Sequence, residues 1–189
     1  YPVTVLWGVV LLTVLLRHKD FEACLAELRR NEELRRLIGI EDENRVPKKW
    51  NLSRFLAVLG SEPHRTQVRE IFDQMARRLG QAVPSLGKHL AGDATALKAK
   101  KLRDAQAQAA EEGDGLPQPS GGRKEYRDDA GKVTEIYEWF GYKLHLLVDV
   151  KHEVAVAYTV TAPSAGDGET LPAVLKQAQG NLPVGRIET

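Results

Sequence analysis

The sequence predicts an α+β protein, with a helical front followed by strands that include a small hairpin, and then a final helix. Over roughly the first 80 residues, apolar side chains recur three and four positions apart, which is the spacing of one helix face. Beyond residue 82 the pattern changes to the alternation typical of strands. A length of 189 residues suits one medium domain or two small ones. We therefore expect a helical domain at 1–80 and a second domain at 85–189.

The expected helices of the front part have recognisable starts and stops. Asp20 is a suitable N-terminal cap, and the apolar pattern behind it continues to Ile38. A short helix at 51–59 ends at Gly60, and Ser61 is placed to cap the helix that follows.

The chain opens with an uncharged apolar run over residues 1–16. A membrane span needs about 18–20 such residues, and this run ends at Arg17. We therefore expect a buried helix, with a membrane anchor as the alternative. Because the run begins at Tyr1 without an initiator Met, we expect the chain to be a fragment of a longer protein.

Strand patterns dominate the second part. We expect a strand at 88–97, a small hairpin at 126–139, strands at 142–149 and 154–161, and a helix at 167–180. Residues 98–123 are polar and rich in Ala, Gln, Glu and Gly, with little to bury. We therefore expect a polar insertion at about 100–139.

Charge and cysteine content exclude several classes of protein. Cys24 is the one cysteine of the sequence, which excludes an internal disulfide and a cysteine zinc cluster and favours a reducing, cytoplasmic compartment. Residues 17–81 carry 14 Lys and Arg against 11 Asp and Glu, so the front part is mildly basic. No phosphate-binding loop, dinucleotide glycine motif, nucleophile elbow or zinc-protease motif occurs.

Asp93 is the first candidate for chemistry. It lies among small residues within an apolar strand, so its carboxylate is expected on a rigid element. A carboxylate in this setting suits a hard divalent cation that also binds substrate phosphate. The alternative is a strand-end aspartate that caps a turn.

Three further polar residues share one face of an expected strand. Lys143, His145 and Asp149 are spaced by even numbers, which places them on the same side of the sheet. They could line a groove for an anionic ligand, or form the solvent face of an edge strand. His145 with Asp93 and Asp149 could also form a metal site.

A basic band surrounds a short helix-turn-helix-like section of the front part. Its members are Arg45, Lys48, Lys49, Arg54, His64 and Arg65. Lys and Arg in such a band contact DNA phosphates, although most basic bands are ordinary solvated surface.

Together these segments resemble bacterial insertion-sequence transposases of the DDE type. The stretches that carry the likeness are LRRLIGI at 34–40, VPKKWNLSRFLAVLG at 46–60, GKHLAGDATALKA at 87–99, EWFGYKLHLLVD at 138–149 and TAPSAGDGETLPAVL at 161–175. The resemblance implies an RNase H-like fold, in which the first three strands are antiparallel. It also implies a site of two Asp and one Glu that binds two Mg²⁺ or Mn²⁺ ions.

The resemblance makes Asp93 the first catalytic carboxylate and a metal ligand. The second Asp and the Glu would lie beyond Thr189, so we expect this fragment alone not to cut DNA. We expect double-stranded DNA as partner, a homo-oligomer on that DNA, no membrane, and a nucleoid-associated location. Lys48, Lys49, Arg54, Arg65, Lys143 and His145 are the expected DNA contacts. The alternative is a non-catalytic DNA-binding regulator derived from a truncated transposase.

Overall fold

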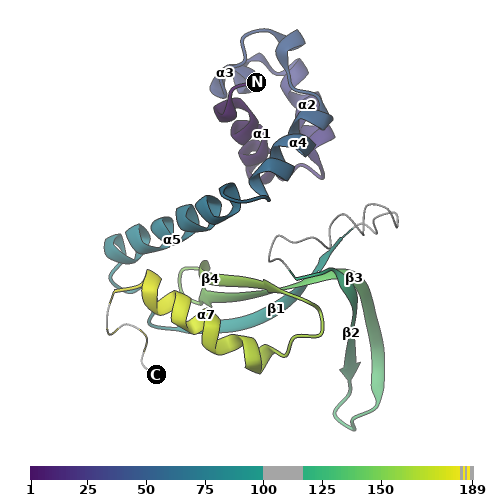
Figure 1. Cartoon of the computed structure of the whole chain (residues 1–189), viewed down its shortest axis with the longest axis vertical. Helices are drawn as coiled ribbons and strands as arrows, with labels where there is room; N and C mark the ends of the chain where they lie inside the picture. Colours follow the sequence, from purple (N-terminus) through teal and green to yellow (C-terminus); the bar gives the residue numbers. More distant parts are fainter. Residues whose placement is uncertain (100–116, 184, 186, 188–189) are drawn as a thin grey trace. The chain divides into compact units, whose positions relative to one another are not determined.

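The computed structural model describes residues 1–99, 117–183, 185 and 187 (Figure 1). These residues form a mixed α+β structure, as the sequence predicts. They divide into two compact units, Tyr1–Thr66 and Gln67–Thr189. The boundary therefore lies at residue 66 and not near residue 80, because most of the helix that follows packs in the second unit.

The first unit consists of short helices around one apolar core. They are α1 (Val3–Leu15), α2 (Phe21–Arg30), α3 (Glu32–Leu37), the 3₁₀ turn η1 (Glu43–Arg45) and α4 (Lys49–Leu59). Helix α2 lies at the centre, since its Cys24, Leu25 and Leu28 are almost fully buried. Buried apolar side chains of α1, α2 and α4 form this core, and the partly buried Leu34 of α3 packs against it.

Helix α1 buries only one face. Val5, Leu6, Val9 and Leu12 are buried, while Val14 and Leu15 are more than two-thirds exposed. The expected buried helix is thus only half covered within the described residues. Across those same residues, no helix combines the length and the apolar character needed to cross a membrane.

Side-chain caps define the starts of α2 and α3 in this unit. The Asp20 carboxylate accepts a hydrogen bond from the Ala23 N–H (2.8 Å), as expected for the cap of α2. The pattern that we expected to run to Ile38 is interrupted, because Asn31 accepts from the Leu34 N–H (3.2 Å) and caps a new helix. The expected cap at Ser61 does not form, since its hydroxyl donates to the Val58 carbonyl.

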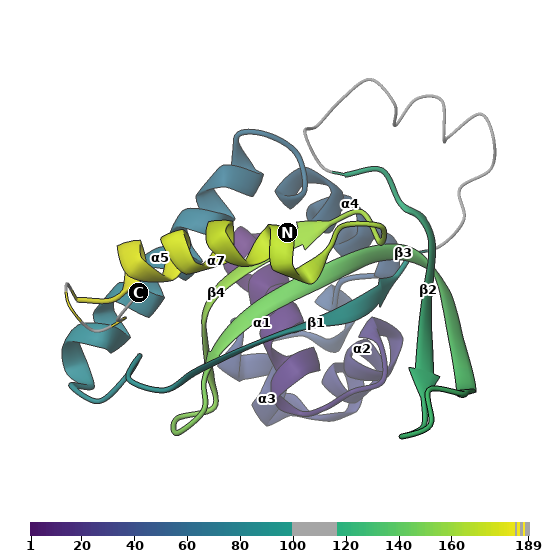
Figure 2. The same ribbon diagram turned by 90° about the horizontal axis from the view of Figure 1, so that it is seen from below.

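The second unit is built on an antiparallel sheet. Its elements are α5 (His64–Ala82), which starts just before the boundary, β1 (Leu90–Lys98), β2 (Ser120–Arg127), β3 (Val133–Asp149), β4 (Val154–Thr161) and α7 (Asp167–Asn181). The inner half of β3, from Gly141 to Asp149, pairs with β1 and with β4. Its outer half, from Val133 to Gly141, pairs with β2. Helix α7 covers one face of this sheet (Figures 1 and 2).

Part of the expected polar insertion is regular structure. Residues 100–116 lie outside the described part of the chain, but β2 and the outer half of β3 form a paired hairpin. Its turn is held by Asp128, whose carboxylate accepts from the Ala130 and Lys132 N–H groups. The expected hairpin at 126–139 is therefore present and is longer than predicted.

Gly141 marks the point at which β3 passes from the hairpin to the main sheet. Its φ of +151° is rarely adopted by residues with a side chain, and a Cβ there would collide with the Leu97 carbonyl. Glycine thus allows one continuous strand to serve both parts.

Candidate functional site

Asp93 lies in the middle of β1, and its side chain is exposed. The register pairs Asp93 with Leu146 and Ala94 with His145. Because paired residues point to the same side of a sheet, the Asp93 carboxylate belongs to the face opposite His145. One carboxylate oxygen accepts a hydrogen bond from the adjacent Ala94 N–H (2.7 Å). Asp93 is thus on a strand, as predicted, and accessible to a ligand.

The other face of β3 carries the polar cluster that the alternation predicts. Lys143, His145 and Asp149 point toward the side that α7 covers, and β3 is an inner strand there. The cluster is therefore neither an open groove nor the solvent face of an edge strand. Each of its members has a protein partner.

Lys143 is bound to the beginning of α7. Its ammonium lies 2.8 Å from a carboxylate oxygen of Asp167 and donates to the Ala165 carbonyl (3.0 Å). The pKa of Asp167 lies below its usual value, first because of the hydrogen bond from Lys143 and then because of the nearby positive charges. This pair fixes the helix start against the sheet.

His145 is almost fully buried beside the same carboxylate. Its Nδ1 lies 3.5 Å from Asp167, and its Nε2 lies 2.9 Å from the Thr161 hydroxyl. The same hydroxyl lies 3.1 Å from the Ala162 carbonyl, so Thr161 links the histidine to the end of β4. Burial lowers the pKa of His145, an effect that Asp167 opposes and Lys143 reinforces.

Asp149 stabilises local backbone structure. Its buried carboxylate accepts from the Gly87 N–H (2.7 Å) and the His152 N–H (2.8 Å). Burial alone would raise the pKa of Asp149, but these hydrogen bonds outweigh it, and the pKa is lowered. Asp149 thereby joins the entry of β1 to the turn between β3 and β4.

The metal site considered for Asp93, His145 and Asp149 is not found. Asp93 faces away from the other two, and both oxygens of Asp149 are engaged by the backbone. Within residues 1–99, 117–183, 185 and 187, no three His, Cys, Asp or Glu side chains lie close enough to hold one metal ion.

A small pocket lies where β1, β3 and the start of α7 meet. Its volume is about 180 Å³, and its lining residues are Gly92, Asp93, His145, Leu146, Asp167, Gly168, Leu171 and Val174. Asp93 contributes to its wall although its carboxylate belongs to the other face, and the pocket joins β1 to His145 and the start of α7, a relation between distant segments that local sequence patterns do not contain. Asp167 is the site residue that the sequence reasoning did not include. Its position as the first residue of a helix was the available signal.

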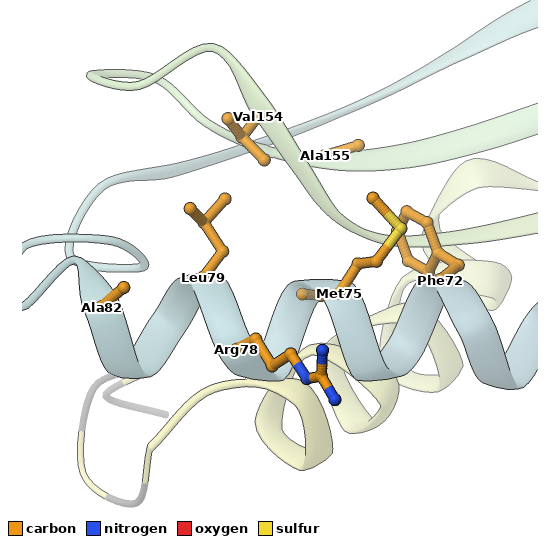
Figure 3. Close-up of a pocket in the computed structure, with 8 residues that line it drawn as sticks. Phe72, Met75, Arg78, Leu79, Ala82, Val154 and Ala155 are labelled. Carbon is orange, nitrogen blue, oxygen red and sulfur yellow. The ribbon is translucent and has the colours of Figure 1, made fainter. Parts of the chain in front are cut away.

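A larger pocket, of about 490 Å³, lies between α5 and the start of β4. Figure 3 shows Phe72, Met75 and Leu79 directed toward Val154 and Ala155, with Arg78 turned the other way. Its lining is almost wholly apolar, so it can hold an apolar group but supplies no acid, base or metal ligand.

The expected DNA contacts of the first unit differ in their exposure and in whether they already form an ion pair. Lys48 and Arg54 are exposed, and Lys49 is exposed in an ion pair with Glu22 (2.9 Å). Arg65 is half-buried and bound to the Glu62 carboxylate (2.7 Å). Lys143 and His145, in the second unit, both lie against the Asp167 carboxylate at the start of α7. Neither side chain is therefore positioned to contact a DNA phosphate.

Comparison with known proteins gives no assignment: no protein-family model, curated protein or solved structure matches the chain.

Proposed function

We propose that the second unit is the beginning of an RNase H-like catalytic domain, and that the chain belongs to a DDE-type DNA transposase. The observation that carries this proposal is the topology. Strands β1, β3 and β4 form an antiparallel set followed by a helix across one face, and Asp93 lies at the middle of the first of these strands.

Asp93 is proposed to bind a catalytic Mg²⁺ or Mn²⁺ ion. Its carboxylate is the type of ligand that these hard cations take, and its exposure leaves room for a phosphate oxygen on the same ion. Two such ions stabilise the attacking and leaving oxygens during phosphodiester cleavage and transfer to a 3′-hydroxyl. The proposal requires two more carboxylates from outside the described residues.

The helical unit is proposed to bind double-stranded DNA at the ends of the mobile element, within a homo-oligomer in the bacterial nucleoid. Lys48, Lys49 and Arg54 support this role, since all three side chains are exposed at the first turns of α4 or just before it. Such contacts to phosphates position a protein on DNA without reading its sequence.

The test uses the product of the complete reading frame, with DNA carrying the element ends and Mg²⁺. We expect Asp93→Asn to abolish strand cleavage while DNA binding persists, because only the metal ligand is lost. Asp129→Asn, in the exposed hairpin turn, is the control with the same chemical change and should cleave normally.

Normal cleavage by Asp93→Asn would show that Asp93 is not a catalytic metal ligand. Binding of the ends without cleavage by the unaltered protein would instead favour the non-catalytic regulator.

A further inference from the structure

The outer part of the sheet forms an arm whose role the proposed catalysis does not explain. The arm consists of β2 and Val133–Phe140 of β3, and it lies beyond the N-terminal end of α7 in both views (Figures 1 and 2). Alternation of side chains gives the arm two faces with different chemistry.

One face of the arm, here called the aromatic face, combines rings with lysines. The register places Lys124 opposite Tyr137 and Gly122 opposite Trp139 on this side. The aromatic face comprises Lys124, Tyr126, Glu135, Tyr137 and Trp139 of the arm, and Lys98 of β1 lies beside it on the same side of the sheet. The register thus gathers rings and cations on one surface.

The rings of this face are held in place. Tyr137 stacks on Trp139, with centroids 5.8 Å apart and planes at 26°. The Trp139 indole N–H donates to the Tyr142 carbonyl (3.0 Å), and the ring lies directly over Gly122, where a Cβ would collide with it. Tyr126, further out along the arm, is 44% exposed. Tyr137 and Trp139 are therefore ordered and half-buried, and Tyr126 is the more accessible ring.

The two lysines lie over these rings. The Lys98 ammonium is 5.3 Å from the centre of the Tyr137 ring, and the Lys124 ammonium is 5.3 Å from that of Tyr126. On the opposite face, Arg123 and Arg127 are both bound to the Glu125 carboxylate. Positive charge is thus paired with acid on one face and placed beside rings on the other.

We propose that the aromatic face binds single-stranded nucleic acid. Bases stack on Tyr126 and Tyr137, and each displaces a lysine, whose ammonium then contacts a neighbouring phosphate. An unpaired strand is required, because the base faces of a duplex are already stacked on one another. The inference goes beyond the proposed catalysis and does not depend on Asp93.

Binding is measured by fluorescence anisotropy of labelled 20-nucleotide dT and rU strands and of a 20-base-pair duplex. We expect Tyr126→Ala and Tyr137→Ala each to weaken single-strand binding by about five- to a hundredfold, the loss of one stacked base. Tyr126→Phe and Tyr137→Phe keep the ring and should bind normally. Comparison of dT with rU shows whether DNA or RNA is preferred.

The charge test has a matched control on the adjacent residue. Lys124→Gln should weaken binding and reduce the salt dependence by about one phosphate contact, whereas Arg123→Gln, on the opposite face, should not. Circular dichroism melting of each variant verifies that the arm is still folded. Asp93→Asn should bind like the unaltered chain, which separates this inference from the catalytic proposal.

Several results would overturn the proposal. They are failure of both strands to bind at micromolar protein, equal binding of the duplex, equal losses from Lys124→Gln and Arg123→Gln, or normal binding by both folded alanine variants.

Discussion

His145 occupies a different environment in the structure from the two that its sequence position suggested, a ligand groove or a solvent-facing strand. The even spacing of Lys143, His145 and Asp149 correctly predicts that they share one face of a strand. It does not predict that the face is covered, because Asp167 and Thr161 reach it only through the fold. A local alternation pattern shows which residues share a face of a strand, but it does not identify contacts with residues that are distant in the sequence.

The lowered pKa of His145 leads to a prediction about stability and pH. In the unfolded chain this histidine takes up a proton near its usual pKa of about 6.5, whereas burial opposes protonation in the folded protein. Its contribution to stability is therefore complete above about pH 6.5 and decreases as the pH falls below that value. Thermal melting between pH 7.5 and 5 should show this loss, and His145→Gln should reduce it.

His89→Gln is the control, because His89 is an exposed histidine of the same unit. Asp167 and Asp149 also have lowered pKa values, but they lose their contribution only near and below pH 4. An identical pH dependence in His145→Gln and the unaltered chain would contradict the prediction.

At the scale of elements, helix α5 is joined to α7 by a polar layer. The Asp73 carboxylate accepts from the Gln177 amide (2.9 Å) and from the Asn181 amide (2.8 Å). Asn181 also donates to the Val156 carbonyl (3.0 Å), and Gln177 accepts from the Tyr158 N–H (3.1 Å). The layer connects both helices to β4.

We expect Asp73→Ala to lower the free energy of unfolding by about 2 kcal/mol, because it leaves two amide donors without their acceptor. Gln74→Ala, at the exposed neighbouring position, should change it by less than about 0.5 kcal/mol. Chemical denaturation followed by circular dichroism measures both. Equal effects of the two substitutions would show that the polar layer does not contribute to stability.

Helix and strand positions were predicted well where the local signal was strong. The cap at Asp20, the hairpin at 126–139 and the alternation before Asp149 all occur as expected. The break at Asn31 was missed, although an Asn followed by two glutamates is a helix-start signal. The continuity of β3 through Gly141 was missed because an isolated glycine suggests an interruption.

At the scale of the whole molecule, the residues that the structure describes form two separate cores. One core uses residues from Val5 to Phe55, and the other uses residues from Leu86 to Leu182. The sequence predicted two domains but placed α5 in the first. The helical pattern of α5 is the same in either unit, and only its contacts with α7 and β4 decide where it belongs.

Because the two cores are separate, a cavity in one core should destabilise its own unit and leave the other unit unchanged. Leu28→Ala, at a fully buried position, should destabilise the helical unit by about 2–5 kcal/mol. Hydrogen-exchange mass spectrometry should then show faster exchange in α1 to α4 and unchanged exchange in β3. Val156→Ala, equally buried in the second core, should give the reverse pattern. Faster exchange in both units from either substitution would mean that they unfold together.

The continuity of β3 through Gly141 also determines where the chain can change length. On the outer side, removal of facing residue pairs from β2 and β3 would shorten the arm and leave the rest in register. On the inner side, deletion of one residue would turn Lys143 and His145 to the wrong face and separate both from Asp167. We therefore expect paired insertions and deletions to be tolerated on the arm side of Gly141, and single-residue changes not to be tolerated between Gly141 and Asp149.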